Sequence, residues 1–90
     1  MFRLDKKIAG AGINVTIDGQ LSADCVSVIE TCCDEALANG KGIDLVLRDV
    51  PSVDEAGCAL LRRLAAKGVR LIGNGVYTSY LVESLKLADG

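Results

Sequence analysis

Five residues near the middle of the chain, 43–47 (Ile-Asp-Leu-Val-Leu), form an almost unbroken apolar run. Such a run suits a central strand that helices cover on both faces, because a strand with one face in water alternates apolar and polar residues. The segments on either side, 22–38 and 54–67, instead repeat their apolar residues at helical spacing. A buried strand between two helices indicates an α/β protein.

The N-terminal part of the chain predicts a hairpin. Residues 2–8 carry alternating polar side chains and predict an edge strand, while residues 13–17 show the period-two alternation of a half-buried strand. A glycine-rich turn, 9–12, connects the two strands. The following helix is expected to begin after an N-cap at Ser22 and to stop at Asn39.

The C-terminal half predicts a helix, a strand and a last helix. The helix begins at Asp54 and ends at Gly68, the strand covers 69–72, and the last helix covers 76–87. The predicted order is therefore β-β-α-β-α-β-α, with parallel pairing and right-handed crossovers after the hairpin. We expect a single domain over residues 1–90, with three helices packed on a small mixed sheet of about four strands.

The composition of the chain argues against several classes of function. Half of the residues are hydrophobic but only two tyrosines and one phenylalanine are present, so the core must be aliphatic. A net charge of −2 argues against nucleic-acid binding, which normally needs a basic face. No apolar run approaches the roughly 20 residues that span a bilayer. The charged segment 1–7 does not resemble a signal peptide, so a cytoplasmic location is expected.

The four cysteines predict neither a disulfide framework nor a metal site. Three lie on the helix expected over 22–38, and the chain has no CxxC pair and no histidine. We expect reduced thiols that pack as small hydrophobic side chains. A zinc or redox role is the alternative reading of these residues: Cys25, Cys32, Cys33 and Cys58.

No catalytic constellation is evident, and no cofactor is expected. Asp54 and Glu55 have no nucleophile or base partner nearby in the sequence. Cys58 falls in the first turn of a helix, but the two acidic residues oppose a thiolate there. The loop 73–75 (Gly-Asn-Gly) lies between a strand and a helix without the full spacing of a nucleotide loop. We therefore expect a protein that is not an enzyme, with a small nucleotide-binding enzyme as the alternative.

The turn at 54–57 (Asp-Glu-Ala-Gly) has two readings. Asp54 is a good N-cap, Glu55 favours the positive end of a helix, and Gly57 permits close packing against the sheet. This structural reading competes with a functional one, because the turn follows a buried strand, where α/β proteins commonly place working residues.

The order of elements and the segment 43–75 resemble a STAS domain, the sulphate-transporter and anti-sigma-factor-antagonist module. Residues 15–21 resemble the family's strand followed by Gly-x-Leu and the first helix. Residues 50–57 resemble its V-x-x-[VI]-D-x-x-G turn, and 69–73 resemble the strand that follows a leucine-rich helix. The similarity covers nearly the whole chain.

The resemblance implies a regulatory protein that binds a protein partner. In anti-sigma factor antagonists a Ser or Thr just before the glycine is phosphorylated by the partner, which is both kinase and anti-sigma factor, and phosphate disrupts the docking surface. Here Ala56 stands at that position, so no phosphorylation is expected there. Glu55 replaces a second hydroxyl residue, and Val46 stands where many members carry aspartate.

Two further alternatives follow from the resemblance. The STAS subunit of the Mla-type phospholipid ABC transporter, which docks on an ATPase subunit, carries alanine at the position of Ala56. Glu55 either imitates a phosphorylated state or is an ordinary first-turn acid. In each case we expect one contact surface, formed by the following residues: Asp54, Glu55, Ala56, Gly57, Arg62, Arg63 and Asn74.

Overall fold

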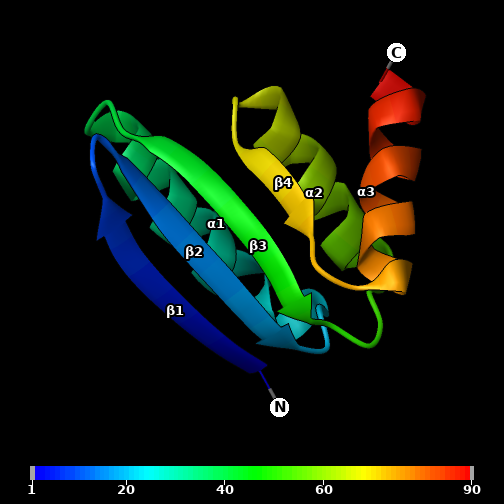
Figure 1. Ribbon diagram of the computed structural model, residues 1–90. Helices are drawn as coiled ribbons and strands as arrows, with labels where there is room; N and C mark the ends of the chain where they lie inside the picture. The colour runs from blue at the N-terminus through cyan, green and yellow to red at the C-terminus, as the bar shows by residue number, and fades with distance from the viewer. Residues whose placement is uncertain (1, 90) are drawn as a thin grey trace.

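The computed structural model describes residues 2–89 as seven elements in the order expected from the sequence (Figure 1). Two strands come first, followed by three alternating helices and two further strands. Their bounds are β1 Phe2–Ala9, β2 Gly12–Gly19, α1 Ala23–Ala38, β3 Gly42–Asp49, α2 Glu55–Ala66, β4 Arg70–Gly73 and α3 Val76–Asp89.

The four strands form one mixed sheet in the order β1-β2-β3-β4. β1 pairs with β2 in antiparallel register, from Phe2 opposite Gly19 to Ala9 opposite Gly12. β2 with β3 and β3 with β4 are parallel. The hairpin, the edge position of β1 and the parallel pairing are confirmed. Gly10, at φ 61°, occupies the hairpin turn, where the left-handed backbone favours glycine.

The helices cover only one face of the sheet. In Figure 1, α1 and α2 lie behind the strands, and α3 packs against β4 at the edge of the sheet. The expectation that helices cover both faces of β3 is wrong. Ile43, Leu45 and Leu47 are buried, whereas Asp44 and Val46 on the other face are only half-buried. The run 43–47 looked like a strand buried on both faces because Val46 is apolar, although Val46 does not face the helices.

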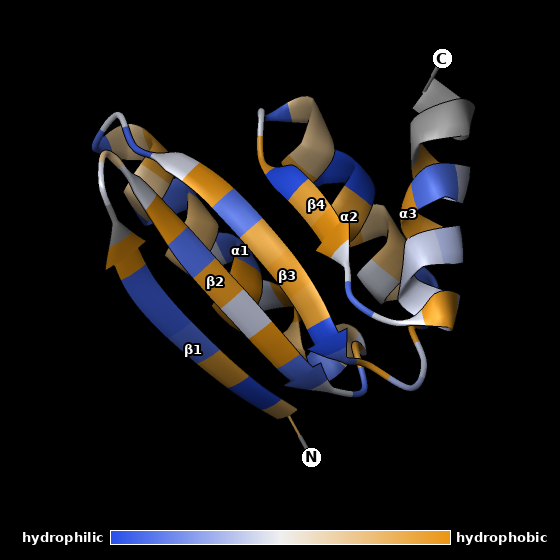
Figure 2. Cartoon of the chain, in the orientation of Figure 1, coloured by the Kyte–Doolittle hydropathy of each residue, from blue (hydrophilic) through white to orange (hydrophobic). Residues whose placement is uncertain are grey.

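The core is aliphatic, as the composition implied. Hydropathy alternates along β2, whereas residues 45–47 of β3 are all apolar (Figure 2). The buried side chains of both strands form one core with those of α1 and α2. The fully buried side chains include Val15, Ile17, Leu45, Leu60 and Leu64. Over residues 2–89, no helix combines the length and the apolar character needed to cross a bilayer.

Candidate functional site

The turn at 54–57 and the loop before α3 lie at the same edge of the sheet. Because β3 and β4 are parallel, their C-terminal ends meet at one edge. α2 begins after the segment that leaves β3, and the β4–α3 connection contains Asn74. The backbone N–H of Asn74 donates a hydrogen bond of 3.1 Å to the carbonyl oxygen of Leu47 near the end of β3. The tertiary structure therefore brings both predicted contact segments to one end of the molecule.

Asp54 is the N-cap of α2, as the sequence predicted. Its Oδ1 accepts a hydrogen bond of 2.8 Å from the backbone N–H of Gly57. Its second hydrogen bond has no signal in the local sequence: Oδ2 accepts a bond of 3.2 Å from the N–H of Ala23, the first residue of α1. The two residues are 31 positions apart. One carboxylate thus satisfies donors at the beginnings of two helices.

Gly57 is buried where the start of α2 approaches the β2–α1 connection. A Cβ atom there would lie 2.7 Å from Cγ1 of Val53 and 2.8 Å from the carbonyl oxygen of Leu21. Leu21 and Val53 form an isolated parallel bridge, and the N–H of Asp54 donates to the oxygen of Leu21 at 3.0 Å. Gly57 is therefore required for packing, and its own atoms are not available to a partner.

The other two residues of the turn differ in exposure. Ala56 is half-buried, and Glu55 is exposed in the first turn of α2. Within residues 2–89 the Glu55 side chain has no hydrogen-bond or ion-pair partner. A free carboxylate at this place adds to the favourable interaction with the helix dipole and remains available for external contact.

The two arginines of α2 have different environments. Arg63 forms a two-bond ion pair with Glu30 of α1, with Nε–Oε2 at 2.9 Å and Nη2–Oε1 at 3.1 Å. Lys67 joins this group through Glu30 at 3.4 Å and Asp34 at 2.8 Å. The Arg63 side chain is thus occupied in an ion pair that connects α1 and α2.

Arg62 is exposed as well but, by contrast, has no ion-pair partner within the described chain. It follows Glu55 by seven positions, two helical turns, so the two side chains lie on the same face of α2. Of the charged residues predicted on this helix, Glu55 and Arg62 are the ones whose charges remain free.

The cysteines pack as expected from a reduced protein, and all four are free thiols. Cys25 and Cys33 are buried on the inner face of α1, and Cys32 and Cys58 are half-buried. Burial, followed by the neighbouring Cys32 thiol and Asp34 carboxyl, raises the pKa of Cys33 to about 11. Across residues 2–89, no three His, Cys, Asp or Glu residues gather in a way that could hold a metal ion.

Comparison with known proteins finds similarity in structure alone. No protein-family model matches the chain, and a search of curated proteins found no match. An anti-sigma factor antagonist from Mycobacterium paratuberculosis is similar with a TM-score of 0.80 and 12% sequence identity, over 99% of this chain and 81% of that one. The anti-sigma factor antagonist SpoIIAA in its unphosphorylated form gives a TM-score of 0.63 and 20% identity, over 100% of this chain and 99% of that one.

A protein called Mglu is similar over a shorter segment. The TM-score is 0.62 at 20% identity over 79% of this chain, but the match spans only 19% of the length of Mglu. Identities this low establish the fold and no shared activity. The four-stranded mixed sheet, its three helices and the full-length match to SpoIIAA lead to one conclusion: this chain has the SpoIIAA-like, or STAS, fold.

Proposed function

We propose that this chain is a regulatory protein-binding module of the anti-sigma-factor-antagonist type that lacks the phospho-acceptor, and that it is not an enzyme. It acts as one domain in the cytoplasm. The observation that supports the proposal most is that Glu55 and Arg62 carry free charges on the exposed face of α2, whose first turn lies at the edge of the sheet that also carries Asn74. Opposite charges without internal partners steer and orient a protein partner.

The seven residues expected in the contact surface have separate tasks in this proposal. Asp54 and Gly57 shape the turn, and Arg63 fixes α2 against α1. Glu55, Arg62 and Asn74 make the polar contacts, and Ala56 provides a small surface between them. With no hydroxyl at Ala56, binding is not switched by phosphorylation at that position.

The two partner classes are an anti-sigma factor with a serine-kinase domain and an ABC transporter ATPase subunit. Ala56 favours the second, because the Mla-type STAS subunit resembles this chain at that position. Glu55 does not favour the second class, because that subunit carries threonine at this position. The first class remains the primary proposal because two anti-sigma factor antagonists are similar in structure over nearly the whole of this chain.

Calorimetric titration with purified proteins of both classes from the source organism tests the proposal. We expect one class to bind, and the charge reversals Glu55→Lys and Arg62→Glu each to weaken binding by about tenfold or more. Glu35→Lys, an equal charge reversal at an exposed residue near the C-terminal end of α1, serves as the control. Failure of both classes to bind, or equal affinity for the reversed and native proteins, would refute the proposal.

The missing switch has its own readout. If a kinase-type partner binds, incubation with ATP leaves the native protein unmodified at the turn, while Ala56→Ser gains one phosphate there. Peptide mass mapping distinguishes the two results. Phosphate on the Ala56→Ser protein at other positions only would argue against equivalence of this turn with the family's phosphorylated turn.

A further inference from the structure

The sheet face without helices carries charged side chains that divide into two groups. At one end, Arg48 forms an ion pair with Asp18, with Nε–Oδ1 at 2.9 Å, and reaches Asp5 at 3.9 Å. Arg3 completes this group through Asp5 at 3.5 Å. The Arg48 hydrogen bond is the main reason why the pKa of Asp18 lies below its ordinary value. These charges neutralise one another.

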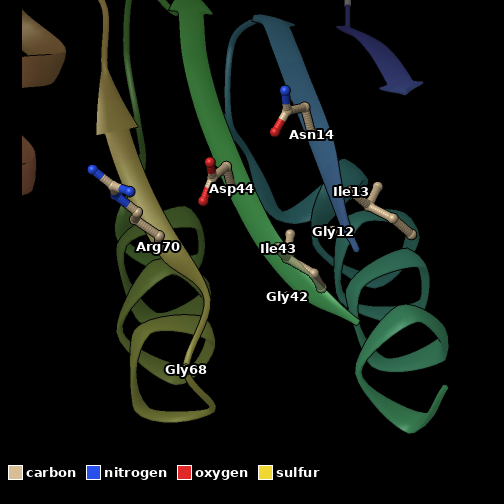
Figure 3. Close-up of a pocket in the computed structure, with 8 residues that line it drawn as sticks. All are labelled: Gly12, Ile13, Asn14, Gly42, Ile43, Asp44, Gly68 and Arg70. Carbon is tan, nitrogen blue, oxygen red and sulfur yellow. The ribbon is translucent and has the colours of Figure 1, made fainter. Parts of the chain in front are cut away.

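At the other end, the charges of Lys7, Asp44 and Arg70 remain unpaired within residues 2–89; Lys7 lies opposite Asn14 on β1 and does not line the hollow described below. Asn14 of β2, Asp44 of β3 and Arg70 of β4 follow one another across the sheet, because Asn14 is opposite Asp44 and Asp44 is opposite Arg70. Figure 3 shows the three side chains on neighbouring strands. Asp44 and Arg70 do not form an ion pair, and neither side chain has a hydrogen-bond partner within residues 2–89.

A hollow adjoins this row. Gly12 and Gly42 are opposite each other on β2 and β3, two residues before Asn14 and Asp44, and therefore lie on the same sheet face. Neither has a side chain, and a Cβ atom at Gly42 would find no atom within 4 Å. The result is a hollow of about 430 Å³, whose lining comprises these glycines, Asn14, Asp44 and Arg70 together with Ile13, Ile43 and Gly68 (Figure 3). Its size falls in the range of small-molecule sites.

The charges around the hollow select for a ligand that carries both signs. Asp44 repels a simple anion and attracts a cation, whereas Arg70 does the reverse. A ligand with both an ammonium and a carboxylate group satisfies both side chains. We propose that the hollow bounded by Asn14, Asp44 and Arg70 binds a small zwitterion of the α-amino-acid class.

The binding mode follows from the hydrogen-bonding chemistry of the three side chains. The ligand ammonium group donates to the carboxylate of Asp44, and the guanidinium group of Arg70 donates two bonds to the ligand carboxylate. The Asn14 amide supplies one donor group and one acceptor beside them. The bare backbone at Gly12 and Gly42 lets the ligand approach the sheet closely.

NMR titration of the full chain, followed at backbone amides, tests this site with three probes. L-alanine carries both charges, acetate only the negative one and methylammonium only the positive one. We expect L-alanine to cause saturable shifts at Gly12, Gly42 and Asp44, and each single-charge probe to bind about tenfold more weakly, because it forms only one of the two charged interactions. No saturable shift with L-alanine, or equal binding of acetate, would overturn the proposal.

Substitutions locate the site. Asp44→Asn and Arg70→Gln are each expected to weaken L-alanine binding about tenfold, while Glu35→Gln, a charge removed from α1, leaves it unchanged. Retained dispersion of the amide spectrum shows that each variant is folded. Unchanged affinity in both site variants would place any bound L-alanine elsewhere and overturn the proposal. The result is independent of the protein-partner titration, since none of these residues belongs to the surface around Glu55.

Discussion

At the scale of single residues, the most consequential side chain is Asp54. Its two oxygens bind two backbone N–H groups, one at the start of α2 and one at the start of α1. An N-cap ordinarily serves its own helix. Here the carboxylate also connects two segments that are distant in the sequence, so its removal affects both helices.

We predict a graded loss of stability at this position. Asp54→Ala removes both hydrogen bonds and is expected to lower the free energy of unfolding by roughly 2 kcal/mol, at the upper end for a lost N-cap. Asp54→Asn keeps an oxygen for Gly57 but presents an amide to Ala23, so its loss should be smaller. Urea unfolding followed by circular dichroism measures the series.

The neighbouring residue provides the control for Asp54. Glu55→Ala removes an exposed carboxylate that has no partner in the described chain, so it should reduce stability far less than Asp54→Ala. Equal losses in the two alanine variants would contradict the double-cap interpretation. Because we expect substitutions at Asp54 to lower stability and those at Glu55 to leave it nearly unchanged, binding is tested at Glu55.

At the scale of elements, the position of α2 depends on its close approach to the β2–α1 connection. The bridge between Leu21 and Val53 continues the β2–β3 pairing beyond the strands, and Gly57 packs directly on it. The loop before α3 has a similar contact: a Cβ atom at Gly73 would lie 2.5 Å from the backbone of Thr78. Backbone contacts of this kind position the two segments at the proposed contact surface.

We predict that Gly57→Ala is destabilising although alanine is the better helix former. The gain in helix propensity is about 1 kcal/mol, but the new methyl group overlaps Val53 and Leu21, and such overpacking costs typically 1–3 kcal/mol. Gly42→Ala is the matched control, because open space surrounds its Cβ position. A Gly57→Ala protein more stable in thermal unfolding than Gly42→Ala would contradict the close approach.

At the scale of the whole molecule, two separate ion-pair groups connect distant segments. Asp18 of β2 pairs with Arg48 of β3, and Glu30 of α1 pairs with Arg63 of α2 and with Lys67. Hydrogen bonds from Arg48 and Arg63, respectively, are the largest cause that lowers the pKa of each carboxyl group below its ordinary value. Both groups face solvent, so salt screens their contribution.

These pKa shifts predict an acid-dependent loss of stability. A carboxyl group with a lowered native pKa stabilises the fold above its ordinary pKa, which is 3.8 for Asp18 and 4.5 for Glu30. The stabilisation is lost as the pH falls through the lowered native values. We therefore expect the free energy of unfolding to decrease from about pH 4.5 downward, and to do so less at high salt.

Glu30→Gln isolates one group from the rest. Urea titrations between neutral pH and pH 3 should show a shallower acid decrease for this variant than for Glu35→Gln, whose carboxylate is exposed on the same helix. Identical acid profiles for the two variants would show that the Glu30 ion pairs do not contribute to stability.

The amino-acid sequence by itself determined the order of elements and the identity of the α2 cap. The change of hydrophobic period at Ser22 and at Asp54 predicted where the first two helices begin, and Asn39 predicted where the first one ends. These signals can be recognised in the sequence because they act between residues close in the chain. The same local logic placed Asp54 at the N-cap. It could not show the bond to Ala23, since no spacing rule joins residues 31 positions apart.

Only the tertiary structure decided which face of the sheet the helices cover and which charges remain free. An apolar run predicts burial without saying which face of the strand is covered, so Val46 wrongly suggested helices on both faces of β3. Asp44 and Arg70 lie opposite each other only because β3 and β4 pair in that register. Arg62 and Arg63 are neighbours of one residue type and both are exposed, yet Glu30 of α1 pairs with Arg63 and not with Arg62. Packing between distant elements sets these outcomes, because it alone fixes the distances between side chains.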